Sequence, residues 1–250
     1  MEILNTLYEL TGLVFVLGTI VSMGLSLTIK QITGPLRNAR FVIVGLLANF
    51  IVTPIAAYIL IQVFSLDEAL ATGLLLVSLA AGAPGLPKMA EFAKQDTAAA
   101  TSLMVLLVVV TIIALPIALP LLAEVSVTFW DIASGLVYLI LIPLAVSLFV
   151  RARYPEAASA AQPYFTQASN ISLLFLMVLM VVLNFSNVID LFGSGGLLAS
   201  LILVILSAVG AYSLGSVSGS GKWVQAFGAG QRNIAAAMVV ATMNFGNDEI

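Results

Sequence analysis

Ala80-Ala-Gly-Ala-Pro-Gly-Leu-Pro-Lys88 interrupts a long apolar run with two prolines, two glycines and a cation. Each proline lacks the backbone N–H that a helix uses and clashes with the preceding turn, so a continuous helix would lose about 3 kcal/mol or more at each one. The stretch predicts two half-helices, over about 69–82 and 88–94, whose facing ends leave backbone carbonyls and N–H groups without partners. The alternative is a proline kink in a packed helix, with neighbouring helices supplying the missing partners.

A second interruption, Phe227-Gly-Ala-Gly-Gln-Arg-Asn233, lies near the other end of the chain. Its three consecutive polar residues would point about 100° apart on a regular helix, so they cannot all face one groove. The stretch predicts unwinding near Gly228–Gly230 or a polar cavity, whereas the glycines alone are also typical of close helix packing. Interrupted apolar segments in both halves of a membrane chain are typical of a transporter's binding site near the bilayer midplane.

The composition places the chain in a membrane. Of its 250 residues, 61% are hydrophobic and 8% are charged, whereas soluble domains are about 45–50% apolar and about 25% charged. Apolar runs long enough to cross about 30 Å of hydrocarbon recur along the whole chain. We therefore expect an all-α integral membrane protein, a single transmembrane domain over residues 1–250. The expected spans are 8–29, 41–63, 69–93, 97–122, 129–150, 165–188, 196–214 and 223–245.

The loop charges predict an orientation, because basic residues gather on the cytoplasmic side of membrane proteins. The basic residues that fall between spans all lie on one side: Lys30, Arg37, Arg40, Lys94, Arg151, Arg153 and Lys222. The opposite side carries acidic residues: Glu2, Glu9, Asp67, Glu68, Glu124, Asp131, Asp190, Asp248 and Glu249. The chain is thus expected in the cytoplasmic membrane with both termini outside. The polar stretch from Arg151 to Pro163 is interpreted as a cytoplasmic loop that could contain a short interfacial helix, and as a candidate hinge.

Two cations, Lys88 and Arg232, remain inside expected spans. A charge at the bilayer centre costs about 2.5–3.5 kcal/mol even on the lenient insertion scale, so such residues are usually functional. Lys88 has a structural alternative, because it could extend toward the cytoplasmic surface or pair with Glu91 one turn later. For Arg232 a role facing a cavity is favoured.

The absence of two residue types excludes much chemistry. Without cysteine or histidine the chain has no disulfide, no imidazole or thiolate metal ligand, and no Ser-His or Cys-His pair. Asp131, Asp190 and Asp248 fall in loops rather than in an intramembrane pair. We therefore expect no enzyme, no metal site, no cofactor and no nucleic-acid partner. The expected partners are the lipid bilayer and a small organic anion.

The order and spacing of several short motifs resemble the bile acid:sodium symporter superfamily of secondary transporters. These motifs are Met23-Gly-Leu-Ser-Leu-Thr28, Ala48-Asn-Phe with Pro54, Gly73-Leu-Leu-Leu-Val, Ala83-Pro-Gly85, Ala93-Lys-Gln-Asp96 and Gly230 to Asn233. The resemblance implies a fold of two inverted five-helix repeats whose broken helices cross, here with the first and last family helices missing. It implies a panel domain at about 8–29 and 129–188, and a core domain at about 41–122 and 196–245.

The same resemblance indicates that the family's sodium ligands are largely replaced. The expected Ser-Asn pair falls near Lys88-Met89-Ala90, and the expected glutamine falls on Arg232. The other expected ligands fall on Ala100, Met104 and Gly228. Only Asn49 and Asn233 remain as oxygen donors, whereas a hard cation is bound by about five or six oxygens. Sodium binding at these positions is therefore not expected.

The expected function is secondary active transport of a small organic anion, without sodium coupling through the family's usual sites. The candidate substrate-binding residues are Asn49, Pro84, Gly85, Pro87, Lys88, Gly228, Gly230, Gln231, Arg232 and Asn233. Lys88 and Arg232 would either replace bound sodium electrostatically or bind the substrate's anionic group. The alternatives are an inactive or truncated family member and a membrane binding protein that does not transport. The substrate, the coupling ion and the oligomeric state are left open.

Overall fold

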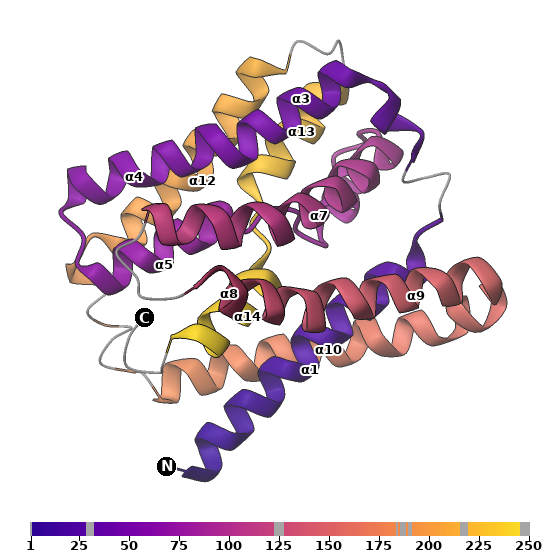
Figure 1. The fold of residues 1–250 in the computed structure, drawn as a ribbon, viewed down its shortest axis with the longest axis horizontal. Helices are drawn as coiled ribbons and strands as arrows, with labels where there is room; N and C mark the ends of the chain where they lie inside the picture. Colours follow the sequence, from indigo (N-terminus) through magenta and orange to yellow (C-terminus); the bar gives the residue numbers. More distant parts are fainter. Residues whose placement is uncertain are drawn as a thin grey trace.

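The computed structural model describes residues 2–28, 33–122, 128–183, 185, 189, 192–215 and 220–245. These residues form helices and short connections, with no strand among them (Figure 1). Among the charges used for the orientation, Lys30, Glu124, Asp190, Asp248 and Glu249 lie outside the described residues. The expectation of an all-α membrane protein is confirmed.

Among the described residues, six helical stretches are long and apolar enough to cross a membrane: Thr6–Ser26, Ala39–Phe64, Thr97–Leu122, Phe129–Arg153, Pro155–Leu183 and Gly196–Leu214. The elements in chain order are α1 (Glu2–Ser26), η1 (Pro35–Arg37), α3 (Ala39–Leu47), η2 (Ala48–Val52), α4 (Thr53–Phe64), α5 (Glu68–Leu79), α6 (Leu86–Phe92), α7 (Thr97–Leu122), α8 (Phe129–Leu136), η3 (Val137–Leu141), α9 (Ile142–Arg153), α10 (Pro155–Leu183), α12 (Gly196–Leu214), α13 (Ser220–Gly230) and α14 (Ile234–Asn244).

Local chemistry explains several helix boundaries. The Asp67 carboxylate accepts a hydrogen bond from the Leu70 N–H at 2.9 Å and caps the start of α5. Thr128 and Asp131 form a reciprocal capping box at the start of α8, which satisfies two N–H groups that a helix start leaves without partners. The π-helical turns η2 and η3 each precede a proline in the first turn of the next segment, where the missing N–H perturbs the helical hydrogen-bond register.

The expected cytoplasmic loop from Arg151 to Pro163 is wrong. Only Tyr154 separates α9 from α10, and α10 continues through Pro163. Pro155 is tolerated because the first helical position needs no intrahelical N–H. The alanines that follow have the highest helix propensity. Arg151 also donates to the Pro155 carbonyl at 3.2 Å, which ties the two helix ends together.

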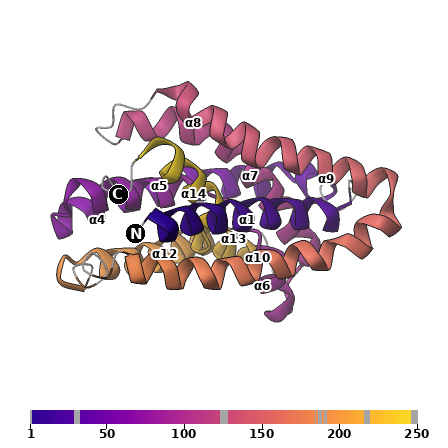
Figure 2. The ribbon, with the colours of Figure 1, turned by 90° about the horizontal axis from the view of Figure 1, so that it is seen from below.

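Helix α1 packs closely between α9 and α10 (Figure 2). A Cβ atom on Gly18 would lie 3.2 Å from the Phe165 carbonyl oxygen, and one on Gly24 would lie 1.9 Å from Ser147 Oγ. The Ser22 hydroxyl lies 2.6 Å from the Thr166 hydroxyl across the same contact. Small residues and hydroxyl pairs of this kind hold membrane helices together, since apolar side chains gain little by leaving lipid.

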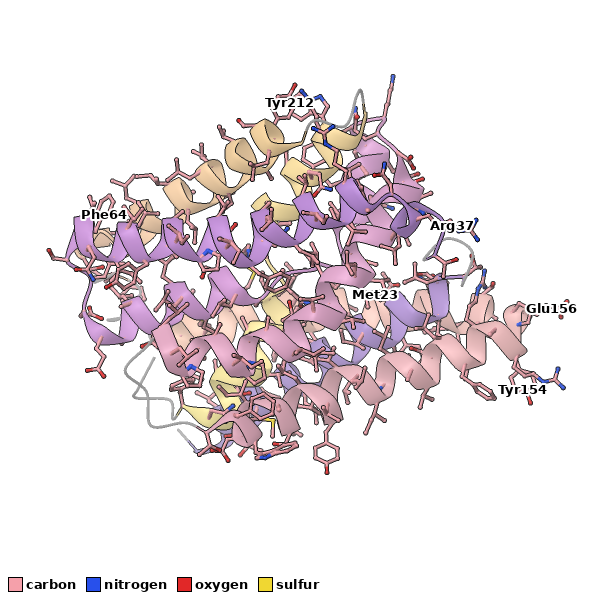
Figure 3. The ribbon with its side chains drawn as sticks, turned by 45° about the horizontal axis from the view of Figure 1, so that its top comes forward. Met23, Arg37, Phe64, Tyr154, Glu156 and Tyr212 are labelled. Carbon is pink, nitrogen blue, oxygen red and sulfur yellow. The ribbon has the colours of Figure 1, made fainter. Side chains whose placement is uncertain are left out.

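The helices other than α1, α9, α10 and α8, which continues through η3 into α9, form a second group. Helix α12 packs on α13 and α4, α5 packs on α4 and α7, and α14 reaches across to α1 and α8. Figure 3 places Arg37 toward the same end of the molecule as Tyr154 and Glu156, with Phe64 at the opposite end. The two interruptions expected from the sequence lie in this second group, between α5 and α6 and between α13 and α14.

Candidate functional site

The first break comprises the six residues Ala80–Gly85, between α5 and α6. Helix α5 ends three residues before the expected position 82, and α6 begins at Leu86 rather than at 88. Gly82 adopts a left-handed backbone conformation with φ of 84°, which strongly favours glycine. Pro87 lies inside the first turn of α6, where proline is favourable. The interruption therefore comes from Gly82 and Pro84 and not from Pro87.

The second break lies at Gln231–Asn233, because α13 continues through Gly230. The expected break near Gly228–Gly230 is therefore present but begins one residue later, directly after Gly230. Both glycines serve close packing, since a Cβ on Gly228 would lie 2.8 Å from Leu103 Cδ2 and one on Gly230 would lie 3.3 Å from Ala208 Cβ.

The two breaks meet through Asn233, which is fully buried. Its backbone N–H donates to the Ala80 carbonyl at 2.8 Å, and its Nδ2 donates to the Gly82 carbonyl at 3.2 Å. Its Oδ1 accepts from the Ala236 N–H at 3.0 Å and caps α14. One side chain thus joins both breaks and starts the second half-helix.

Thr111 of α7 supplies further partners. Its hydroxyl accepts from the Ala81 N–H at 3.1 Å and lies 3.2 Å from the Ala81 carbonyl oxygen, to which it donates. Irregular backbone at membrane depth is tolerated only where protein or water satisfies its polar groups. The crossing meets this condition through side chains of α7 and of the second break.

Arg232 lies at the centre of the crossing, where its guanidinium donates to four oxygens. Nε donates to the Val77 carbonyl at 3.1 Å, and a terminal nitrogen donates to the Ser78 carbonyl. The other terminal nitrogen donates to Asn49 Oδ1 at 3.0 Å and to the Ala229 carbonyl at 3.1 Å. These bonds use four of the five N–H groups that a guanidinium carries.

The acceptors explain why a cation is stable there. Val77 and Ser78 lie in the last turn of α5, and Ala229 lies in the last turn of α13. Carbonyl groups at the end of a helix lack intrahelical partners and carry the negative end of its dipole. Arg232 therefore satisfies the carboxyl ends of two half-helices at once.

Asn49 supplies the remaining acceptor from the π-helical turn η2. The side chain is fully buried, and its Nδ2 donates to the Gly45 carbonyl at 2.9 Å. This bond leaves Oδ1 directed at Arg232. Three backbone carbonyls and one amide oxygen surround the guanidinium, which is the kind of donor set that hard cations prefer in proteins.

Gln231 lies on the other side of the crossing, toward α6. Its Nε2 lies 3.3 Å from Met89 Sδ, and a Cβ on Gly85 would lie 3.8 Å from the same amide. Its Oε1 is buried and has no hydrogen-bond partner among the described residues. The structure thus brings Asn49, Gln231, Arg232 and Asn233 together with the first break.

Lys88 does not join this group. It is exposed on α6, with Nζ 5.7 Å from the centroid of the Phe92 ring. It lines an open groove of about 430 Å³ whose other lining residues all belong to α10. The structure therefore separates the two intramembrane cations that the sequence placed together.

The polar face of α10 was missed in the sequence. Gln162, Thr166 and Asn170 recur every four residues and line the groove opposite Lys88. This spacing was visible, but Gln162 fell in the segment interpreted as a loop, which left only Thr166 and Asn170 inside the expected span. In the sequence, Thr111 looks like any hydroxyl residue in an apolar helix, so nothing marked it as a partner of the first break. The backbone carbonyls of Val77 and Ser78 cannot be recognised from residue types at all.

Comparisons with known proteins point to one family. The model of the sodium bile acid symporter family matches residues 12–191, which include the first break and end before the second. The P3 protein of Bos taurus is 35% identical to this chain over 79 residues. That alignment covers 32% of this chain and 16% of the P3 protein.

Proposed function

Since this chain belongs to the sodium bile acid symporter family, we propose that it is a secondary transporter that carries a small organic anion across the membrane. Its apolar, multi-pass helical structure fits a membrane transporter. The crossing of two broken helices, whose breaks are joined to each other by Asn233 and to α7 by Thr111, supports an alternating-access site at that depth.

The proposed mechanism moves two groups of helices against each other. The panel comprises α1, α8, α9 and α10, and the core comprises α3 to α7 with α12 to α14. Two observations support this division: the close packing of α1 on α9 and α10, and the hydrogen bonds that Arg232, Asn49 and Thr111 make between core elements. If the chain is built from two inverted repeats, the broken helix α5–α6 of one repeat would correspond to the broken helix α13–α14 of the other.

Arg232 carries the proposal that sodium does not couple transport at the crossing. The guanidinium occupies a cluster of four oxygens of the type that would bind a metal cation. A sodium ion about 4 Å from this fixed charge would be repelled by about 4 kcal/mol at an effective dielectric of 20. Arg232 stays charged under physiological conditions. It therefore supplies a fixed positive charge where a sodium ion would otherwise have to bind.

The proposed orientation follows the basic residues. Arg37, Arg151 and Arg153 would face the cytoplasm, and both termini would lie outside. Ser159 is exposed beside this basic end. Because the chain has no cysteine, a Ser159→Cys variant should react with an impermeant thiol reagent only from the inside, and reaction from outside intact cells would contradict the orientation.

Uptake into reconstituted vesicles tests the function. We expect a labelled organic sulfonate such as benzenesulfonate, which stays ionised and crosses lipid poorly, to enter protein-containing vesicles at the same rate in sodium and in choline buffers, and not to enter empty vesicles. Uptake that requires an inward sodium gradient would contradict the proposed role of Arg232. Binding of this anion without any uptake would indicate a membrane binding protein and would contradict transport.

A further inference from the structure

One end of the molecule carries three basic residues without a carboxylate partner. Arg37 ends η1, Arg40 lies in the first turn of α3, and Lys222 lies in the first turn of α13. None of the three forms an ion pair with a described carboxylate. Asp96 lies at the start of α7, which packs on η1, and its carboxylate caps α7 by accepting from the Ala99 N–H at 2.9 Å. The net charge of this end is therefore positive even when Asp96 is included.

Two hydrogen bonds show that α3 and α13 run side by side in the same direction from this end (Figure 1). Near the two helix starts, Gln225 Nε2 donates to the Phe41 carbonyl at 2.8 Å. Further along both segments, the guanidinium of Arg232 donates to Asn49 Oδ1 at 3.0 Å. The basic residues in the first turns of these helices are thus neighbours, and both helices lead inward to the crossing.

Arg40 and Lys222 stand at the same level of the molecule. Arg40 precedes Asn49 by nine residues, and Lys222 precedes Arg232 by ten, so both lie about 14–15 Å from the crossing along the helix axes. Half of a hydrocarbon core of about 30 Å is about 15 Å. With the crossing at the bilayer midplane, as proposed above, both cations lie where the hydrocarbon meets the lipid headgroups.

Beside Lys222 lies an aromatic cluster formed by α12 and α13. The ring of Trp223 lies 5.0 Å from that of Tyr212 and 6.0 Å from that of Phe227, measured between centroids. Trp223 is also 48% exposed. Tryptophan and tyrosine are enriched at the headgroup level of membrane proteins, because they combine an apolar ring with a polar edge. The cluster therefore supports the same level independently of the charges.

The surroundings of Lys222 favour an anionic headgroup over one that carries choline. Its Nζ lies 5.6 Å from the centroid of the Tyr212 ring, so this ring is already paired with a cation, and a second one would be repelled. The stem of Lys222 packs against Gly215, where an added Cβ would lie 3.4 Å from both Lys222 Cα and Cγ. The half-buried stem thus holds the ammonium group beside the aromatic cluster.

We propose that Arg40, Lys222 and Trp223 form a binding site for an anionic phospholipid such as phosphatidylglycerol. Arg40 and Lys222 bind the phosphate, for which arginine offers a forked pair of donors and lysine a point charge. Trp223 lies beside the glycerol, and the acyl chains follow the exposed side chains of Ile43 and Leu47 on α3. This bound lipid is distinct from the transported anion, and only its depth rests on the proposed function.

The chain's two tryptophans allow a direct test, since Trp223 lies beside Lys222 and Trp130 lies beside the acidic Asp131. Trp130→Phe leaves Trp223 as the reporter, and Trp223→Phe leaves Trp130. Each variant is placed in phosphatidylcholine vesicles that contain a minor fraction of either brominated phosphatidylglycerol or brominated phosphatidylcholine, whose bromine atoms quench tryptophan emission at short range. We expect phosphatidylglycerol to quench Trp223 more strongly than phosphatidylcholine does, and the two lipids to quench Trp130 equally.

Removal of single charges tests the site itself. In the Trp130→Phe background, Lys222→Gln should lower the relative affinity for phosphatidylglycerol about fivefold, the factor that corresponds to about 1 kcal/mol per basic residue at a membrane surface. Arg40→Gln, at an exposed position, should lower it similarly and guards against misfolding of the first variant. Arg153→Gln is the matched control, because Arg153 lies 5.7 Å from the ring of Tyr154 on α9, and it should leave the preference unchanged.

Two results would overturn the site. One is equal quenching of Trp223 by the two brominated lipids. The other is a preference that falls as much in Arg153→Gln as in Lys222→Gln, which would show a diffuse field of the whole basic end.

Soluble glycerol phosphate distinguishes a lipid from a free phosphate ester. We expect its addition to the buffer to leave the quenching of Trp223 unchanged, and loss of the preference would overturn the lipid assignment. The measurement involves no transport, so a protein that takes up no sulfonate can still show the lipid preference, and uptake without the preference would overturn this site alone.

Discussion

Replacing Gly82 with alanine is expected to strain the packing of the two breaks and to destabilise the folded protein by about 2–5 kcal/mol. The residue has a φ of 84°, a conformation that costs an L-residue about 1–2 kcal/mol. The added Cβ would also lie 2.6 Å from the Val108 N atom and 2.9 Å from the Met104 carbonyl oxygen. Both are backbone atoms of α7, so the whole helix would have to move.

Overpacking of this kind typically costs a further 1–3 kcal/mol or so. We therefore expect Gly82→Ala to lower the thermal midpoint in detergent by about 10 °C, at roughly 2–4 °C per kcal/mol for a chain of this size. Gly85→Ala is the matched control in the same break, because its φ is −76° and the nearest atoms to an added Cβ lie 3.8 Å away. Equal midpoints for the two variants would contradict the geometry of the first break.

Replacing Arg232 with methionine should produce the second-largest loss. The variant keeps much of the side-chain length but leaves four acceptor oxygens without a donor. A buried group that loses its partner costs about 1–3 kcal/mol, while removal of the charge recovers part of its desolvation cost. We expect a net loss of about 3 kcal/mol, or about 6–12 °C in the thermal midpoint.

Lys88→Met is the control for Arg232→Met, because it removes the other intramembrane cation from an exposed position that has no ion pair among the described residues. Its thermal midpoint should change by less than about 1–2 °C, since surface substitutions usually stay within about 0.5 kcal/mol. If Lys88→Met were as destabilising as Arg232→Met, the guanidinium would not be the group that joins the half-helices.

The sequence predicted that the chain is broken in two places, because proline and glycine act on the backbone directly. It placed the second break within Phe227–Asn233 but not at its exact residues, since Gly228 and Gly230 look alike whether they unwind a helix or let another helix approach. The start of α10 was interpreted as a loop because it contains prolines and polar residues. The high helix propensity of its alanines was given too little weight.

The roles of Lys88 and Arg232 could not be separated from the sequence. Helix α6 has only seven residues, so its periodicity is too short to show which way Lys88 points. The partners of Arg232 are mostly backbone carbonyls, which any residue carries, and only Asn49 left a visible signal. Their convergence depends on where α5 and α13 end, which is a tertiary property.

The thermal midpoint of the purified protein, measured while sodium replaces potassium at constant ionic strength, tests whether Arg232 takes the place of a bound cation. We predict that the midpoint of the unmodified protein is the same in both salts. Arg232→Gln removes the charge but keeps Asn49 Oδ1 and the three carbonyl oxygens, so its midpoint should rise with sodium and not with potassium. A sodium-specific rise in the unmodified protein would contradict the role of Arg232 as a permanent cation.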